Sequence, residues 1–232
     1  MRTATKVRPS VKNVEPHAPV VPAWGDLMPS LQERTDMKRR FIVREAARSF
    51  NKTGFHGTSM GDIAKRLGVT KAALYRYVQS KHELLFESFN VAMDSAFANL
   101  ENGERLGNTG LEKLKIAMKG YLVDLIGNLG HPVVLLEENA LLPEQALVIV
   151  ERRDEAERRY RELIKEGITD GSIAPCDPKL AVFTLLGAVN WVPKWYREGG
   201  AWSADEVAES LVELATRGLA ARHSQELAPT HL

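Results

Sequence analysis

The sequence predicts an all-α protein, with a small three-helix domain that contains a helix-turn-helix and a larger helical domain after it. From about residue 36 onward, apolar residues recur at helical spacing, and no segment alternates as a strand would. Two short helical segments meet at a glycine between residues 58 and 81. Residues 31–85 carry 12 basic and 5 acidic side chains, whereas residues 86–232 carry 15 and 23. A basic module joined to an acidic one is typical of a nucleic-acid-binding domain attached to a domain with another role.

The composition is that of a globular protein. The chain has 232 residues, of which 44% are hydrophobic and 26% are charged, so it can form one large core or two small ones. Cys176 is the single cysteine, which excludes an internal disulfide, and no apolar run is as long as a membrane span or a signal peptide core. We therefore expect a cytoplasmic protein that does not contact a membrane.

Residues 1–30 are expected to form a disordered arm. They contain five prolines and show no sustained period of a helix or a strand. The favoured interpretation is a solvating tail. The alternative is an arm that reaches the minor groove of DNA through its basic residues, which are Arg2, Lys6, Arg8 and Lys12.

A charged helix is expected from about residue 36 to Gly54. Its apolar face carries Ile42, Ala46 and Phe50. We expect this face, together with Phe41, to cover the helix-turn-helix, because a helix-turn-helix alone cannot bury enough apolar surface. The first domain then spans residues 31–85.

The segment at 58–81 has the pattern of a helix-turn-helix. Apolar residues in its first half repeat at spacings of three and four, on one face of a helix. Ser59 and Asp62 make a capping box, so this helix starts at Ser59. Gly68 follows the last periodic residue and suits a left-handed C-cap, which predicts the turn.

The second helix of this motif is the predicted reading edge for DNA. Thr70 is its N-cap, and Leu74 points inward. The residues left facing outward are Lys71, Ala72, Ala73, Tyr75 and Arg76. Lysine and arginine bind phosphate or guanine, a tyrosine hydroxyl bonds phosphate, and alanine permits close approach. A further capping box, Ser80 with Glu83, starts the next helix and places Lys81 beside the DNA backbone.

Residues 86–222 are expected to form a second, wholly helical domain, followed by a flexible tail at 223–232. Glycines and prolines mark the joints between its segments. The predicted helices lie near 81–103, 110–129, 132–141, 144–167, 178–196 and 204–222.

The last two predicted helices favour a homodimer. The helix at 178–196 opens with Asp177 and Pro178 and is apolar nearly all round, so it must be buried on two sides. The helix at 204–222 opens with a Ser203 to Glu206 capping box and has one apolar stripe. A four-helix interface with a second copy would satisfy both helices.

The stretch GTSMGDIAKRLGVTKAALYRYVQSKHELL resembles the DNA-binding signature of the TetR family of one-component transcriptional regulators. The resemblance covers Phe41 to about Leu85, and it implies phosphate contacts from Ser59 and Lys81. It also implies base or phosphate contacts from Thr70, Lys71, Ala72, Ala73, Tyr75 and Arg76. One difference is Gly61, where many relatives have a basic or polar residue that touches DNA. Family members usually dimerise through their last two helices, which agrees with the interface expected above.

The expected function is that of a dimeric regulator, a repressor, that binds a double-stranded inverted-repeat operator and is released by a small ligand. No catalysis is expected. The alternative is an architectural DNA-binding protein without an effector, in which Trp191, Trp195 and Tyr196 serve packing alone.

The effector expected from resemblance is an acyl-CoA thioester. The stretch GAVNWVPKWYREGGAWSADEVAESL resembles the C-terminal segment of TetR-type regulators that sense such thioesters. The residues expected to enclose the acyl chain are Tyr121, Leu125, Leu186 and Trp191. The cations expected to meet the CoA are Arg152, Arg153 and Arg158, although these arginines also fit a solvated, salt-bridged helix face. A neutral hydrophobic drug or an aromatic acid would need the pocket but not the cations.

Two other patterns do not support a catalytic or metal site. Residues 57–61 spell G-x-S-x-G, the nucleophile motif of serine hydrolases, but that motif needs a preceding buried strand and a charged helix precedes it here. The six histidines are never spaced as metal ligands on a helix, nor do they lie beside the cysteine. We therefore expect no metal and no cofactor.

Overall fold

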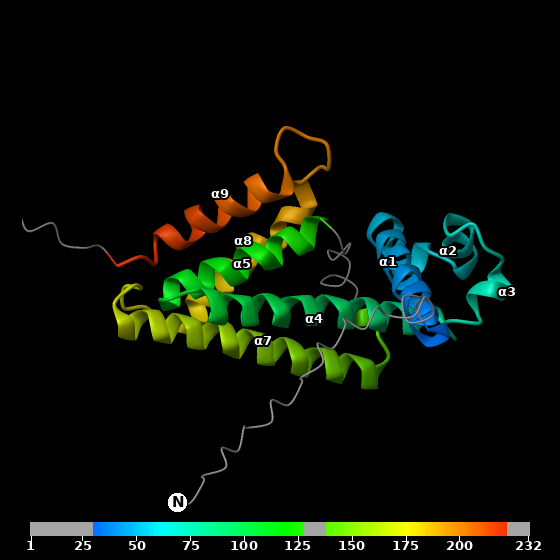
Figure 1. The fold of residues 1–232 in the computed structure, drawn as a ribbon, viewed down its shortest axis with the longest axis horizontal. Helices are drawn as coiled ribbons and strands as arrows, with labels where there is room; N and C mark the ends of the chain where they lie inside the picture. The colour runs from blue at the N-terminus through cyan, green and yellow to red at the C-terminus, as the bar shows by residue number, and fades with distance from the viewer. Residues whose placement is uncertain (1–29, 128–137, 222–232) are drawn as a thin grey trace, which may run out of the picture.

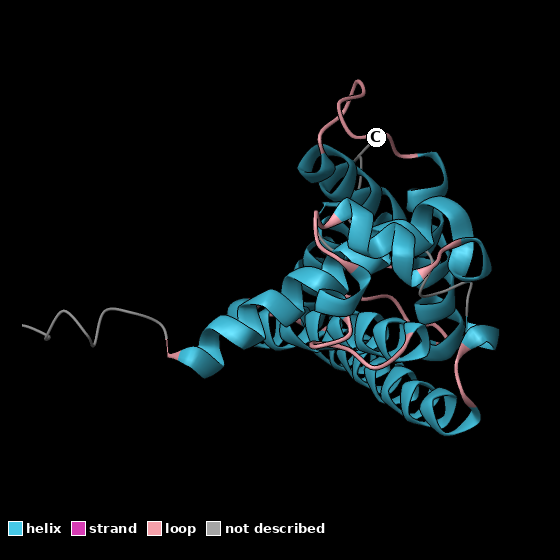
Figure 2. Ribbon diagram, turned by 90° about the vertical axis from the view of Figure 1, so that its right-hand side faces the viewer, coloured by secondary structure: helices cyan, strands magenta, loops and turns pink. Residues whose placement is uncertain are grey.

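The computed structural model describes residues 30–127 and 138–221. Within these ranges the chain is helical, and its extended pairing is limited to one isolated bridge between Ile173 and Ala220. Figure 2 shows helices joined by loops throughout the described chain. The predicted all-α class is confirmed. No helix of the described ranges is long and apolar enough to cross a membrane.

Three helices form the N-terminal unit: α1 (Leu31–Gly57), α2 (Met60–Arg66) and α3 (Lys71–Leu74). Helix α1 starts earlier than predicted, because Ser30 and Glu33 form a capping box with bonds of 3.1 and 2.6 Å. Residue 30 is thus a helix cap, and the rest of the predicted arm lies outside the described residues. At Gly54 the backbone takes a φ of 76° and breaks the helix, as the sequence predicted.

The core of this unit lies where α1 packs over the helix-turn-helix. Its fully buried side chains include Phe50, Ile63 and Leu74. Phe41 was expected in this core, but it is 54% exposed. It directly precedes buried Ile42, and one residue turns a helix by about 100°, so its side chain leaves the buried face.

The larger unit contains α5 (Gly110–Gly127), α7 (Pro143–Asp170), α8 (Pro178–Trp195) and α9 (Ala204–Arg217). Figure 1 shows these helices at one end of the molecule and α1, α2 and α3 at the other, joined by the long helix α4 (Lys81–Leu106). The helix predicted at 132–141 begins outside the described residues, and Glu138–Ala140 forms a single 3-10 turn. The predicted tail at 223–232 also lies outside them.

Helices α5 and α7 cross at a pair of glycines. A Cβ atom on Gly110 would lie 2.1 Å from the backbone nitrogen of Gly167. A side chain at this crossing would therefore push the two helices apart. The close approach holds one end of the bundle on which α8 and α9 pack.

Helix α4 is tied by ion pairs to both units. Arg39 of α1 lies 2.7 Å from the Glu83 carboxylate, and Arg152 of α7 lies 2.6 Å from that of Asp94. Such exposed pairs contribute little stability individually. They attach α1 and α7 to the same helix, α4.

Candidate DNA interface and effector cavity

Helix α2 begins as the sequence predicted. The Ser59 hydroxyl accepts a 3.1 Å hydrogen bond from the Asp62 amide, and the Asp62 carboxylate accepts bonds of 2.6 and 2.9 Å from the Ser59 hydroxyl and amide. These hydrogen bonds, the Ser59 hydroxyl first, lower the pKa of the Asp62 carboxyl. The capping box fixes the Ser59 side chain at the surface.

The turn and the start of the second helix also match the prediction. Gly68 has a φ of 66°, and the Thr70 hydroxyl accepts a 3.1 Å bond from the Ala73 amide. Leu74 is fully buried. The second helix is shorter than expected, since α3 ends at Leu74 and a turn follows.

The predicted reading residues divide into two places on the surface. A shallow depression of about 430 Å³ brings together Ser59, Lys71, Tyr75 and Lys81. Arg76 instead lines a separate groove beside α1. Ala73, which is half-buried, lines the same groove as Arg76. Thr70 and Ala72 are exposed. The Tyr75 hydroxyl and the ammonium groups of Lys71 and Lys81 in this depression are donors suited to phosphate oxygens. The hydroxyl proton of Ser59 is donated to Asp62.

Lys81 has a structural contact that the sequence did not predict. Its ammonium donates hydrogen bonds of 2.8 Å to the Phe55 carbonyl and 2.9 Å to the Thr58 carbonyl, and it lies 4.1 Å from the Phe55 ring centroid. It therefore fastens the start of α4 to the end of α1. A lysine ammonium has three donors, so one remains for the predicted phosphate contact.

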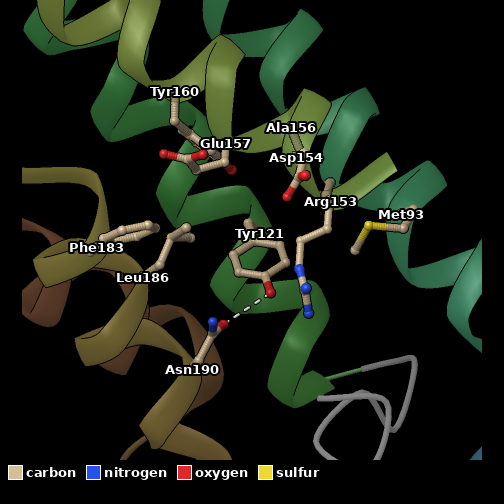
Figure 3. A pocket seen from close by; sticks show the side chains of 11 residues that line it. Met93, Tyr121, Arg153, Asp154, Ala156, Glu157, Tyr160, Phe183, Leu186 and Asn190 are labelled. Atoms are coloured by element: carbon tan, nitrogen blue, oxygen red, sulfur yellow. Dashed lines mark hydrogen bonds between the residues drawn. The ribbon is translucent and has the colours of Figure 1, made fainter. Parts of the chain in front are cut away.

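A cavity of about 330 Å³ lies between α4, α5, α7 and α8 (Figure 3). Its apolar lining includes Met93 of α4 and Phe183 of α8. Of the residues predicted to bind the effector, the structure brings Tyr121, Arg153 and Leu186 to this cavity.

The other predicted effector residues lie away from the cavity walls, and the structure gives a reason for each. Leu125 is buried in the core of the bundle. Arg152 and Arg158 form ion pairs with exposed acidic side chains. Trp191 is 63% exposed. It follows cavity-lining Asn190, so the helix turns it about 100° away, onto the outer face of α8.

Polar groups that the sequence did not single out also line the cavity. The Tyr121 hydroxyl donates a 3.0 Å hydrogen bond to Asn190 Oδ1, and burial raises the pKa of Tyr121 to about 12. The Glu157 carboxylate pairs with Arg161 at 3.0 Å. Tyr160 is buried, and burial raises its pKa as well. The sequence shows that Glu157 and Tyr160 lie on the same helix face, because they are three residues apart. It does not show that this face meets the cavity.

Helices α8 and α9 present an apolar outer surface. The exposed large side chains of these helices are Leu180, Phe183, Trp191, Trp195 and Leu214, of which Phe183 also borders the cavity. Trp202, in the loop between α8 and α9, is exposed as well. Trp195, Trp202 and Leu214 line one shallow groove. Exposed apolar side chains that gather in this way are typical of an interface with another protein.

Among the described residues, no group of three or more histidine, cysteine or acidic side chains is arranged to hold a metal ion. Ser59, the serine of the hydrolase-like motif, follows the helical segment α1 and caps α2. Its local structure is not that of a nucleophile elbow, which needs a preceding strand.

A helix-turn-helix with basic surroundings, joined by one long helix to a bundle that encloses a ligand-sized cavity, defines a ligand-responsive DNA-binding regulator. Residues 42–87 match the family model described as bacterial regulatory proteins, tetR family. Residues 107–219 match the model described as the tetracyclin repressor-like C-terminal domain. The chain belongs to the TetR family of transcriptional regulators.

Solved structures and curated proteins of this family are similar over most of the chain. The regulator PfmR from Thermus thermophilus is 32% identical, with a TM-score of 0.69 over 77% of this chain and 98% of its own. AibR, solved with isovaleryl coenzyme A and operator DNA, is 30% identical, with a TM-score of 0.66 over 76% and 97%. The HTH-type transcriptional repressor KstR2 from Mycolicibacterium smegmatis is 25% identical over 83% of this chain and 96% of its own.

Proposed function

We propose that this protein is a dimeric repressor that binds an inverted-repeat operator and is released from it by an acyl-CoA thioester. The observation that carries the proposal is that α4 serves both sites. Its first turn, at Lys81, borders the DNA-facing depression, and Met93 of the same helix lines the cavity. A ligand that shifts α4 can therefore move the helix-turn-helix.

On this proposal the N-terminal unit contacts duplex DNA through two kinds of residue. Arg76 and Lys71 read base edges, and small Ala72 and Ala73 let the backbone approach the groove. The residues that hold phosphates are Ser59, Thr70, Tyr75 and Lys81. The exposure of Arg76 outside the depression supports its place on base edges, and the grouping of Tyr75 and Lys81 in the depression supports their place on phosphates.

The dimer forms through the outer faces of α8 and α9, which we infer from their exposed apolar side chains. Burying Trp191 and Leu214 against a second copy removes apolar area from water, at about 25 cal/mol per Å². A symmetric pair places two recognition helices on half-sites about 34–36 Å apart, one turn of DNA.

The cavity supports an acyl group as the buried part of the effector. Its volume of about 330 Å³ lies at the lower end of the range for ligand pockets, which suits an acyl chain rather than a complete CoA. Arg153 lines the cavity and is exposed, so it is placed to meet the CoA phosphates outside. The similarity to AibR, solved with isovaleryl coenzyme A, supports the same class of ligand.

No catalytic step is part of this proposal, and the effector leaves unchanged. Release follows if the thioester binds better to a dimer whose recognition helices no longer fit one turn of DNA. By linkage, operator DNA must then weaken the affinity for the thioester by the same factor.

Footprinting on genomic DNA fragments tests the regulatory part of the proposal. A repressor of this kind protects one symmetric site in each fragment that it selects. An architectural protein without an effector would protect many unrelated sequences with little preference, and that pattern would contradict the proposal.

A further inference from the structure

The hydroxyl group of Tyr160 is enclosed in the wall of the cavity without a hydrogen-bond partner. Tyr160 is 2% exposed and lines the cavity from α7 (Figure 3). Among the residues that the structure describes, none accepts from or donates to its oxygen. Buried hydroxyls nearly always have a partner, because leaving one unpaired is destabilising. This orphan donor therefore indicates that a ligand atom completes its bonding.

The neighbouring polar groups of the cavity already have partners within the protein. The hydroxyl of Tyr121 donates to Asn190, across the cavity from α5 to α8 (Figure 3). Arg161 Nη2 donates a 3.2 Å hydrogen bond to Glu157 Oε2, and Arg161 Nε lies 3.0 Å from Glu157 Oε1 in the same ion pair, although these last two atoms are not aligned as a hydrogen bond. The charges of Glu157 and Arg161 thus offset each other, whereas the Tyr160 hydroxyl has neither an ion-pair nor a hydrogen-bond partner among the described residues.

The enclosure of Tyr160 limits the kind of atom that can approach its hydroxyl. Glu157 lies one turn before Tyr160 on the same face of α7, and both line the cavity. Arg161 offsets the charge of Glu157, so the main cost for a ligand carboxylate at this point is the loss of water around its own charge. A neutral oxygen has a smaller desolvation cost. Burial also raises the pKa of Tyr160, so its hydroxyl keeps its proton and can donate.

We propose that Tyr160 is the specificity residue of the cavity, donating a hydrogen bond from its Oη to a neutral carbonyl oxygen of the effector. This inference rests on the proposed function, because an acyl-CoA thioester has such an oxygen at the head of its acyl chain. The contact selects a ligand with a carbonyl at this point over one with a methylene group or a carboxylate there.

Calorimetric binding of two CoA compounds to the full-length protein tests this contact. Hexanoyl-CoA is the thioester, and S-hexyl-CoA is the matching thioether, in which a methylene replaces the carbonyl. The wild type should bind the thioester about tenfold more tightly, the usual effect of one hydrogen bond to a buried group. The Tyr160→Phe variant keeps the ring and removes the hydroxyl, so it should bind both compounds alike.

The Tyr121→Phe variant is the matched control. The Tyr121 hydroxyl is already used by Asn190, so this variant should keep the preference for the thioester. A Tyr160→Phe protein that keeps the full preference, or a wild type that binds both compounds equally, would overturn the role of Tyr160 while leaving acyl-CoA binding in place. Failure of the wild type to bind either compound would overturn the acyl-CoA proposal, and this inference with it.

Thermal unfolding of the ligand-free proteins gives a readout that needs no ligand. Since the Tyr160 hydroxyl has no partner in the described structure, removing it should leave the melting temperature unchanged or raise it. A clear fall in the melting temperature of Tyr160→Phe would show that the hydroxyl is already satisfied inside the free protein, and would overturn the inference.

Discussion

The ammonium of Lys81 donates a 2.9 Å hydrogen bond to the carbonyl of Thr58, which joins the first residue of α4 to the segment just before α2. A second bond, to the carbonyl of Phe55, holds the same ammonium against the end of α1. The helix-turn-helix is thus fastened to α4 at its base. Any movement of α4 that a ligand causes should be passed to the DNA-binding unit as a whole.

Lys81→Ala should therefore affect both stability and DNA binding. Losing two hydrogen bonds from a charged donor should lower the free energy of unfolding by about 1–3 kcal/mol. If the ammonium also contacts a phosphate, affinity should fall alike for all sequences, and the slope of log affinity against log salt should decrease by about one. Chemical denaturation and salt-dependent binding measure the two effects separately. An unchanged salt slope would limit Lys81 to its structural contact.

Arg76→Ala should relax the sequence preference of the protein. Arg76 is exposed next to the short helix α3, and a bidentate contact with guanine contributes about 1–3 kcal/mol of discrimination. Binding to the operator and to single-base variants of it measures the change. Lys165→Ala, which removes a cation from α7 in the larger unit, is the control and should keep wild-type discrimination. An Arg76→Ala protein that still discriminates fully would remove this residue from the reading edge.

Trp191→Glu should convert the protein to monomers. Trp191 is exposed on α8, so the change should spare the fold of each chain but place a charge in the proposed interface, where burying it costs several kcal/mol. Leu186 is less suitable for this test, since it lines the cavity. Leu147→Glu, at an exposed apolar residue of α7, is the matched control. Sedimentation of the wild type as a monomer, with intact operator binding, would contradict the dimer.

Ser59→Ala should raise the pKa of Asp62 toward its ordinary value of 3.8. The hydrogen bonds from Ser59 lower this pKa in the folded state, so the capping box stabilises the protein above the ordinary pKa. That contribution is lost as the pH falls through the lowered value. NMR titration of the Asp62 carboxyl in both proteins measures the shift. Equal pKa values in the two would show that the capping box does not form in solution.

Local patterns allowed the sequence to predict the caps and the turn of the helix-turn-helix. The partners in a capping box are three residues apart, so Ser59 and Asp62 could be paired without knowing the fold. The turn at Gly68 could be predicted from that residue alone, because glycine adopts a positive φ without steric strain. The same rule applied to Ser30 and Glu33 would have placed the start of α1 correctly, but the prolines before them favoured a disordered arm.

The cavity was harder to predict, because its walls come from four helices far apart in the sequence. Tyr121 and Leu186, which were expected to enclose an acyl chain, do line this cavity, whereas Tyr160 was not among the expected residues. Helix α8 is apolar nearly all round, so its sequence does not show which face meets the cavity and which faces outward. For that reason Trp191 was expected inside, and the structure places it on the outer face.

Titration of operator-bound protein with hexanoyl-CoA and with free hexanoic acid, followed by fluorescence anisotropy of labelled operator DNA, tests whether an acyl-CoA releases the repressor. We expect the thioester to release the DNA at concentrations where the acid does not, and operator DNA to weaken thioester binding by the same factor. Release by the free acid as readily as by the thioester, or no release by a series of acyl-CoAs of increasing chain length, would contradict an acyl-CoA-responsive repressor.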